Sequence, residues 1–472
     1  MAELVAALKA DARRSVIVLP DLHSEAAADL VLELVRLPHV RLIVESRSGS
    51  PAHQLLSRID CAEMDLDLEQ WRDRERFDRW FASAGERQDL VSCEPAVEGI
   101  DLSDPVAVCK GDPQAVTVGY ERDGDDYGGL RSAWLRAGQA LCREEAPATR
   151  ALVLAAALGD SADPRLGPAL AELGSDASWR LEWSRVCGDR TPPWPGPVIA
   201  LSTGIGPLSG YLVVAGQQET VRIMSLDDAS AYGRFVSPCG TPRSLAVLED
   251  GTVLLLDGSG RVHVETGWVS RRSKTGLQSL LDEESSDGER VLLPLAPKPA
   301  TAVAAVADGL GGFVVLGDAA GAVTSFGAAV TSAVLHKGPV TAVAGLQLAL
   351  SGDERVSLVY SGGADGAVRA WSPGHSPMTE PVIRRPCPVV SLDARDTTQG
   401  PSLVVAWRDG AVDWIHPDTA TRRTFRSGLS VRSVSLSADN RVVIGTDEAV
   451  VCLRPRLPSD EGGARTRPAG LA

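Results

Sequence analysis

The C-terminal two-thirds of the chain alternates short apolar runs with polar turns that contain glycine or aspartate. The clearest case is SGGADGAVRAW (residues 361–371), where an extended run ends at Gly362, residues 364–366 form a turn and a second run begins near Val368. Two such runs joined by a short Asp-Gly turn are typical of a β-hairpin. We therefore predict a hairpin at this position.

The same hairpin pattern recurs along the chain. Aligned on one valine, its six copies centre on Val221, Val262, Val323, Val368, Val412 and Val450. The steps between copies are close to the roughly 40–45 residues of one propeller blade, except the second, which a polar insertion at residues 270–289 lengthens. Each copy follows another apolar run, and the first five precede a more polar one. Four strands per unit with a polar outer strand predict a β-propeller of six blades, with seven as the alternative.

The sixth unit has no outer strand of its own, because after Leu453 the chain becomes rich in proline, glycine and arginine. A suitable strand precedes the first unit. In WRLEWSRV (residues 179–186), alternation with a period of two places Trp179, Leu181 and Trp183 on one face. We predict that this segment is the outer strand of the last blade and closes the ring, which removes free sheet edges.

The fourth unit resembles a WD repeat. LHKGPVTAV loosely matches the glycine-histidine start of that repeat, and SGGADGAVRAW matches its strand-turn-strand segment ending in tryptophan. The resemblance implies a buried hydrogen-bonded set, with a structural and not a catalytic role, formed by His336, Ser361, Asp365 and Trp371. The other units keep glycine and, at Asp318 and Asp409, the turn aspartate, but have no matching histidine.

The first residues have a different pattern. Residues 15–20 (SVIVLP) and 39–44 predict two buried strands, and between them Leu30, Val31, Leu34 and Val35 share one face of a helix. This order is a βαβ unit.

The βαβ unit resembles the second half of the P-loop ATPase domain of STAND-type regulators. That resemblance implies a metal position near Asp21 and a sensor position near Ser46 or Arg47. Pro20 stands where an acidic residue usually ends the strand, and the chain contains no G-x-x-x-x-G-K-[ST] motif. We interpret this part as a truncated, non-hydrolysing remnant.

A helical region connects the two parts. Apolar residues at i, i+3 and i+4 spacing mark buried helix faces, first at Trp71, Phe77, Trp80 and Phe81, then at Leu130, Trp134, Ala137 and Leu141. The predicted fold class is an α/β plus helical N-terminal module followed by an all-β propeller. We divide the chain into residues 1–64 (α/β), 65–176 (helical), 177–455 (propeller) and 456–472 (disordered tail).

Charge and cysteine content narrow the function. Asp and Glu (62) outnumber Lys and Arg (47), and the net charge of −15 disfavours nucleic acid and anionic membranes and favours a protein partner with a basic patch. The eight cysteines are dispersed without a CxxC pair, which predicts reduced thiols in a cytoplasmic protein. No apolar run approaches the ~20 residues that span a bilayer, and the N-terminus does not match a signal peptide.

The sequence offers no catalytic constellation. Asp123, Asp125 and Asp126 lack the alternating spacing of a calcium loop, and His23 beside Asp21 fits a capped turn better than an acid-base pair. We expect a non-catalytic scaffold without cofactor or metal. Two alternatives stay open: a nucleotide-dependent regulator whose P-loop half is missing or supplied by a partner chain, and a fragment of a longer gene product.

Overall fold

The computed structural model describes part of the chain, namely residues 15–22, 31–35, 37, 40–46, 53, 56, 99–143, 146–186, 198–217, 219–266, 299–306, 313–327, 329–349 and 355–456. The chain divides into two compact units, Met1–Glu94 and Pro95–Ala472. Residues 71–81, the insertion at 270–289, the predicted strand at 291–293 and the tail from 457 lie outside the described residues.

The first unit contains two parallel strands, β1 (Ser15–Leu22) and β2 (Val40–Ser46), with helical residues 31–35 between them. Val31 and Leu34 of the helix are buried, and Leu34 packs with Val40 and Ile17. Val35, which the sequence places on the same helix face, is 44% exposed. Successive helical residues are about 100° apart, so Val35 lies at the margin of the buried face.

Five α-helices lie within the described part of residues 99–173 in the second unit. They are α5 (Pro105–Lys110), α6 (Pro113–Arg122), α7 (Leu130–Leu141), α8 (Pro147–Ala157) and α9 (Leu166–Leu173). The carboxylates of Asp104 and Asp112 accept hydrogen bonds from backbone N–H groups of the first turns of α5 and α6, each of which begins with proline. The predicted stripe on α7 (Leu130, Trp134, Ala137, Leu141) is confirmed, because all four side chains are fully buried.

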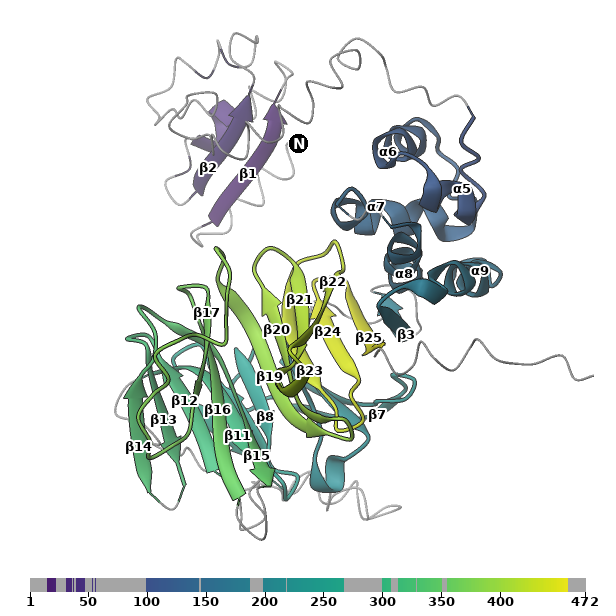
Figure 1. The fold of residues 1–472 in the computed structure, drawn as a ribbon. Helices are drawn as coiled ribbons and strands as arrows, with labels where there is room; N and C mark the ends of the chain where they lie inside the picture. Colours follow the sequence, from purple (N-terminus) through teal and green to yellow (C-terminus); the bar gives the residue numbers. More distant parts are fainter. Residues whose placement is uncertain are drawn as a thin grey trace, which may run out of the picture. The chain divides into compact units, whose positions relative to one another are not determined.

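Six antiparallel sheets form the rest of the second unit (Figure 1). Blade 1 contains β4 (Val198–Thr203), β5 (Tyr211–Gly216), β6 (Thr220–Ser225) and β7 (Ala231–Val236). Blade 2 contains β8 (Ser244–Val247), β9 (Val253–Leu256) and β10 (Val262–Glu265). Blade 3 contains β11 (Ala300–Val306), β12 (Phe313–Asp318), β13 (Ala322–Phe326) and β14 (Val330–Val334).

The remaining three blades follow the same order. Blade 4 contains β15 (Val340–Ala349), β16 (Arg355–Gly363), β17 (Ala367–Trp371) and β18 (Ile383–Arg384). Blade 5 contains β19 (Val389–Thr397), β20 (Gly400–Trp407), β21 (Ala411–His416) and β22 (Thr421–Arg426). Blade 6 contains β23 (Val431–Leu436), β24 (Val442–Thr446), β25 (Ala449–Pro455) and β3 (Trp179–Val186).

The ring is closed with six blades. The first strand of each blade contacts the first strand of the next, in the order β4, β8, β11, β15, β19 and β23, and β23 contacts β4 again. The fold is therefore a six-bladed β-propeller, and the alternative of seven blades is wrong. The closing strand β3 precedes blade 1 in the sequence and lies beside β25 as the outer strand of blade 6 (Figure 1).

Strand β3 does not present its apolar residues on one face, contrary to the sequence-based prediction. Trp183 is opposite Cys452 and Leu181 is opposite Leu453, so Glu182 is an extra residue that forms a β-bulge. A bulge reverses the alternation that follows it. Trp179 and Leu181 consequently pack on the side of blade 5, whereas Trp183 packs against blade 1. The indole N–H of Trp179 donates to the carbonyl of Thr424, and that of Trp183 donates to the carbonyl of Leu226.

The helices share one hydrophobic core with blades 5 and 6. That core joins Trp134 of α7 and Leu154 of α8 with Trp179, Trp414 and Phe425 of the propeller. A boundary between residues 176 and 177 therefore crosses a continuous core. Among the helices that the structure describes, none has the length and apolar character needed to cross a membrane.

Candidate functional site: the central channel

The inner strands of the six blades line a channel of about 1040 Å³. They run in the same direction, so all six begin at one end of the channel, which we call the N-terminal mouth, and end at the C-terminal mouth. Residues at the N-terminal mouth include Arg243, Pro339, Pro388, Arg408 and Arg432. Those at the C-terminal mouth include Ile205, Glu249, Gln347, Arg355 and Asp396.

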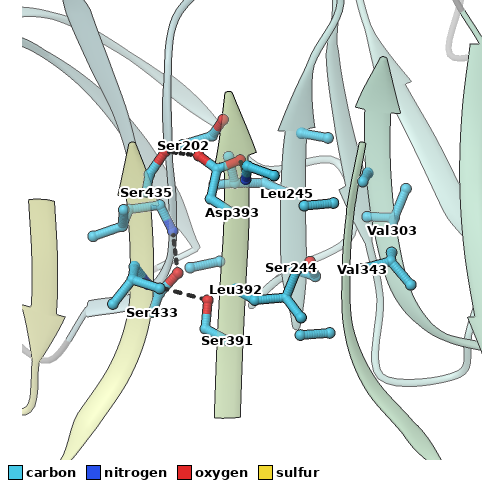
Figure 2. Close-up of a pocket in the computed structure, with 18 of the residues that line it drawn as sticks. Ser202, Ser244, Leu245, Val303, Val343, Ser391, Leu392, Asp393, Ser433 and Ser435 are labelled. Carbon is cyan, nitrogen blue, oxygen red and sulfur yellow. Dashed lines mark hydrogen bonds between the residues drawn. The ribbon is translucent and has the colours of Figure 1, made fainter. Parts of the chain in front are cut away.

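Side chains in the channel wall connect blades 5 and 6 (Figure 2). Ser391 Oγ accepts a hydrogen bond from the backbone N–H of Val434 at 3.1 Å. The Asp393 carboxylate accepts from Ser435 Oγ at 2.6 Å and from the N–H of Leu436 at 2.8 Å. Each inner strand is a sheet edge, so these contacts satisfy N–H groups that the strand's own blade does not pair.

The same arrangement continues from blade 6 to blade 1. Ser433 Oγ accepts from the N–H of Leu201 at 3.1 Å, and Ser435 Oγ accepts from the N–H of Thr203 at 2.9 Å. Ser435 is thereby held between Asp393 of blade 5 and Thr203 of blade 1. Short hydroxyl side chains link the closing blade to both neighbours and leave the channel open.

Charge is distributed unequally between the two mouths. The charged side chains that line the N-terminal mouth are three arginines, Arg243, Arg408 and Arg432, and all three are exposed. The C-terminal mouth combines Arg355 and Arg395 with the carboxylates of Glu249 and Asp396. Local sequence patterns could not reveal either set, because its residues come from several blades.

Three of the four residues implied by the WD-repeat resemblance meet in blade 4. His336 Nδ1 lies 3.0 Å from Asp365 Oδ1, and His336 Nε2 lies 2.8 Å from Ser361 Oγ. Trp371 is buried but does not join them, since its indole N–H donates to the carbonyl of His375 at 2.9 Å. Trp371 is opposite Val359, two residues from Ser361, and the carbonyl of the following turn accepts its only side-chain N–H in place of the Ser361 hydroxyl.

Burial and hydrogen bonding determine the protonation of this triplet. Burial lowers the pKa of His336, although the Asp365 carboxylate acts in the opposite direction. Burial alone would raise the pKa of Asp365, but hydrogen bonds from His336 and from the N–H groups of Lys337 and Ala367 outweigh it and lower the pKa. At neutral pH, Asp365 is thus an ionised acceptor, His336 is neutral and donates through Nδ1, and its Nε2 accepts the Ser361 hydroxyl.

This triplet gives the free energy of unfolding a pH dependence. The unfolded chain protonates His336 near pH 6.5, whereas folded blade 4 resists that proton, so stability falls as the pH drops below about 6.5. One full proton corresponds to about 1.4 kcal/mol per pH unit. Urea denaturation of the full chain and of a His336→Gln variant at several pH values measures the effect. We expect a shallower pH dependence in the variant, and equal slopes would contradict the assignment.

Blade 5 contains a buried polar cluster that sequence analysis missed. Asp413 of β21 is fully buried and accepts hydrogen bonds from Trp407 Nε1 at 2.7 Å, Arg422 Nη2 at 2.6 Å and Thr424 Oγ1 at 2.6 Å. Arg385 lies 3.5 Å from the same carboxylate and 5.5 Å from the centre of the Trp407 ring. In the sequence, this cluster is indicated by a single acidic residue within the apolar run AVDWI (residues 411–415). Trp407 and Trp414 are both fully buried and lie in the core.

Turn aspartates have a shared role in several blades. Asp318 and Asp409 accept from backbone N–H groups of their own turns, as Asp365 does. Asp257 accepts from the N–H groups of Ser259 and Arg261 and lies 2.9 Å from His263 Nε2. Blade 2 therefore has an aspartate-histidine contact built from residues that the repeat pattern did not identify.

The candidate nucleotide site of the first unit is described only in part. Asp21 lies on β1 next to Leu22, whose backbone partner on β2 is Ser46, so the C-terminal ends of both strands meet there. Arg47 and His23 lie outside the described residues.

The acidic loop at residues 121–129 has local hydrogen bonds. Asp126 accepts from Ser132, and Asp123 accepts from the hydroxyl of Tyr127. Across the described ranges, no group of His, Cys, Asp and Glu side chains is arranged to hold a metal ion.

Comparisons with known proteins give weak likenesses. No protein-family model matches the chain, and no curated protein matches its sequence. Among solved structures, the WD40 repeats of RRP9 share 11% identity over 59% of this chain and 98% of that chain, with a TM-score of 0.37. U3-55K shares 12% identity over 60% of this chain and 99% of that chain, also with a TM-score of 0.37. The six-bladed architecture rests on the strand pairing described above.

Proposed function

We propose that this chain is a non-catalytic scaffold that binds a partner protein through its propeller. The observation that carries the proposal is the closed ring, in which cross-blade hydrogen bonds and the closing strand hold the loops at fixed positions around an open channel. Rigidly placed loops are a common way to present binding residues. The five described cysteines form no disulfide, which agrees with a cytoplasmic location.

We further propose that the partner carries a basic patch and binds at the C-terminal mouth. Exposed carboxylates belong to the loops at that end, among them Asp227, Glu249, Asp396 and Asp418. With the overall charge of −15, they favour fast association with a positively charged surface and a binding constant that falls with salt.

Affinity capture with the full chain, followed by binding measurements with the purified partner, tests this function. We expect affinity to fall at high salt and by about tenfold in a Glu249→Lys, Asp396→Lys double variant, since like charges then face each other. Glu172→Lys on α9 makes the same kind of charge change outside the propeller and should have no effect. A partner that binds all three proteins equally would contradict this binding surface.

A nucleotide-dependent regulator is the second candidate. It is favoured by the parallel strands β1 and β2, whose C-terminal ends bring Asp21 near Ser46 in the backbone register. Calorimetric titration of the full chain with ATP and Mg²⁺ separates the two candidates. Heat that disappears in Asp21→Ala supports the regulator, and no heat supports the scaffold.

A further inference from the structure

The three arginines of the N-terminal mouth come together only through the ring. Arg243 precedes the first residue of β8, and Arg432 is the second residue of β23. Arg408 follows β20, and its backbone N–H donates to the carbonyl of Pro388, directly before β19. All three side chains line the channel where inner strands begin, on blades 2, 5 and 6.

Two of these arginines have no acidic partner among the residues that the structure describes. Arg432 forms an ion pair with Asp447 at 2.6 Å, whereas within the described residues Arg243 and Arg408 make no ion pair. Acidic residues do occur in the turns at this end. Asp257, Asp318 and Asp409, however, accept hydrogen bonds from their own turns, and none of them lines the channel. The channel opening itself therefore presents unneutralised positive charge.

Just inside the arginines, the wall combines prolines with small polar residues. Pro339 and Pro388 line this part of the channel beside Thr341 and Ser430. A side chain with an aliphatic stem and an anionic tip fits such an opening, since its stem can contact the proline rings while a guanidinium binds its carboxylate in a charge-assisted, two-pronged geometry.

We propose that the N-terminal mouth binds an acidic peptide segment of a partner, with glutamate or aspartate carboxylates bound by Arg243 and by Arg408. The inference extends the scaffold function and concerns the opposite mouth from the basic-patch surface. A nucleic acid is a poorer occupant, because the overall charge of −15 and the surrounding turn carboxylates repel a continuous phosphate backbone.

The test measures binding of short dye-labelled peptides to the full chain by fluorescence anisotropy. The probes are a glutamate-rich peptide, a lysine-rich peptide, a phosphoserine peptide and a single-stranded oligonucleotide. We expect the glutamate-rich peptide to bind in a salt-sensitive manner and the lysine-rich peptide not to bind. Arg243→Ala and Arg408→Ala should each weaken binding about tenfold, the loss typical of one charged hydrogen bond, and Arg408→Glu should abolish it.

Arg234→Ala is the matched control, because Arg234 is an exposed arginine on the outer strand β7. Its affinity should equal that of the unchanged chain, and circular dichroism should show all variants folded. Tighter binding by the phosphoserine peptide with the same arginine dependence identifies phosphate as the preferred anionic group and supports the site. The proposal is overturned if the glutamate-rich peptide does not bind, if Arg234→Ala weakens it equally, or if the oligonucleotide binds more tightly through the same arginines. Binding of the basic partner is measured separately, with the Glu249→Lys, Asp396→Lys double variant. Either proposal can therefore fail without the other.

Discussion

A chain that begins at Val198 is expected to aggregate instead of folding into a soluble propeller. This truncation removes β3, the outer strand of blade 6. The backbone edge of β25 and the buried side chains of Val451, Cys452 and Leu453 then lose their cover. An open, apolar sheet edge promotes pairing with other chains.

The energetic loss is large because β3 contacts both neighbouring blades. Trp179 packs edge-on against Phe425 at 6.4 Å between ring centres and donates to blade 5, whereas Trp183 donates to the carbonyl of Leu226 in blade 1. Losing one buried tryptophan side chain typically costs about 3–5 kcal/mol. Two such losses are comparable with the total stability of roughly 5–15 kcal/mol of an ordinary domain.

Two longer chains separate the effect of losing β3 from the effect of losing the helices. A chain that begins at Ala177 retains β3 but loses α5 to α9, and a chain that begins at Gly99 retains the whole shared core. We expect the first to fold with a melting temperature lowered by roughly 10 °C, since several kcal/mol of packing is removed, and the second to match the full chain. Size-exclusion chromatography and thermal denaturation make the comparison. A soluble monomer from Val198 with the stability of the Gly99 chain would refute the role of β3.

Periodicity predicted the propeller because each blade repeats the same alternation of apolar strands and polar turns. The missing outer strand of the sixth unit even indicated where the ring closes. The bulge at Glu182 could not be predicted in this way, because one extra residue changes the facing of Trp183 without leaving a mark in the composition.

Local sequence patterns could not identify the arginines of the channel, for a different reason. His336, Ser361 and Asp365 lie within one repeat, so a motif identified them. Arg243, Arg408 and Arg432 belong to three blades, and only the closed topology brings them to one mouth. Trp371 shows the converse error, since a motif match assigned it a contact with the triplet, whereas its indole N–H donates to the carbonyl of His375.

Asp413→Ala is expected to destabilise blade 5, because buried polar groups lose their common acceptor. It leaves the N–H of Trp407, the hydroxyl of Thr424 and the guanidinium of Arg422 without their acceptor. Leaving the N–H of the fully buried Trp407 without an acceptor costs about 1–3 kcal/mol, whereas the guanidinium of Arg422, whose side chain is 43% exposed, regains water. Asp413→Asn keeps the shape and one acceptor oxygen, so its loss should be intermediate.

Asp409→Ala provides the matched comparison. Asp409 also binds Arg385, at 2.6 Å, but its side chain is 31% exposed, whereas that of Asp413 is not exposed at all. Water replaces the lost partner at an exposed site, and a pair of this kind contributes about 0–1 kcal/mol. Urea denaturation of the full chains, with hydrogen exchange over residues 411–426, ranks the variants. If Asp409→Ala and Asp413→Ala shift the denaturation midpoint equally, the buried carboxylate is not what holds β20, β21 and β22 together.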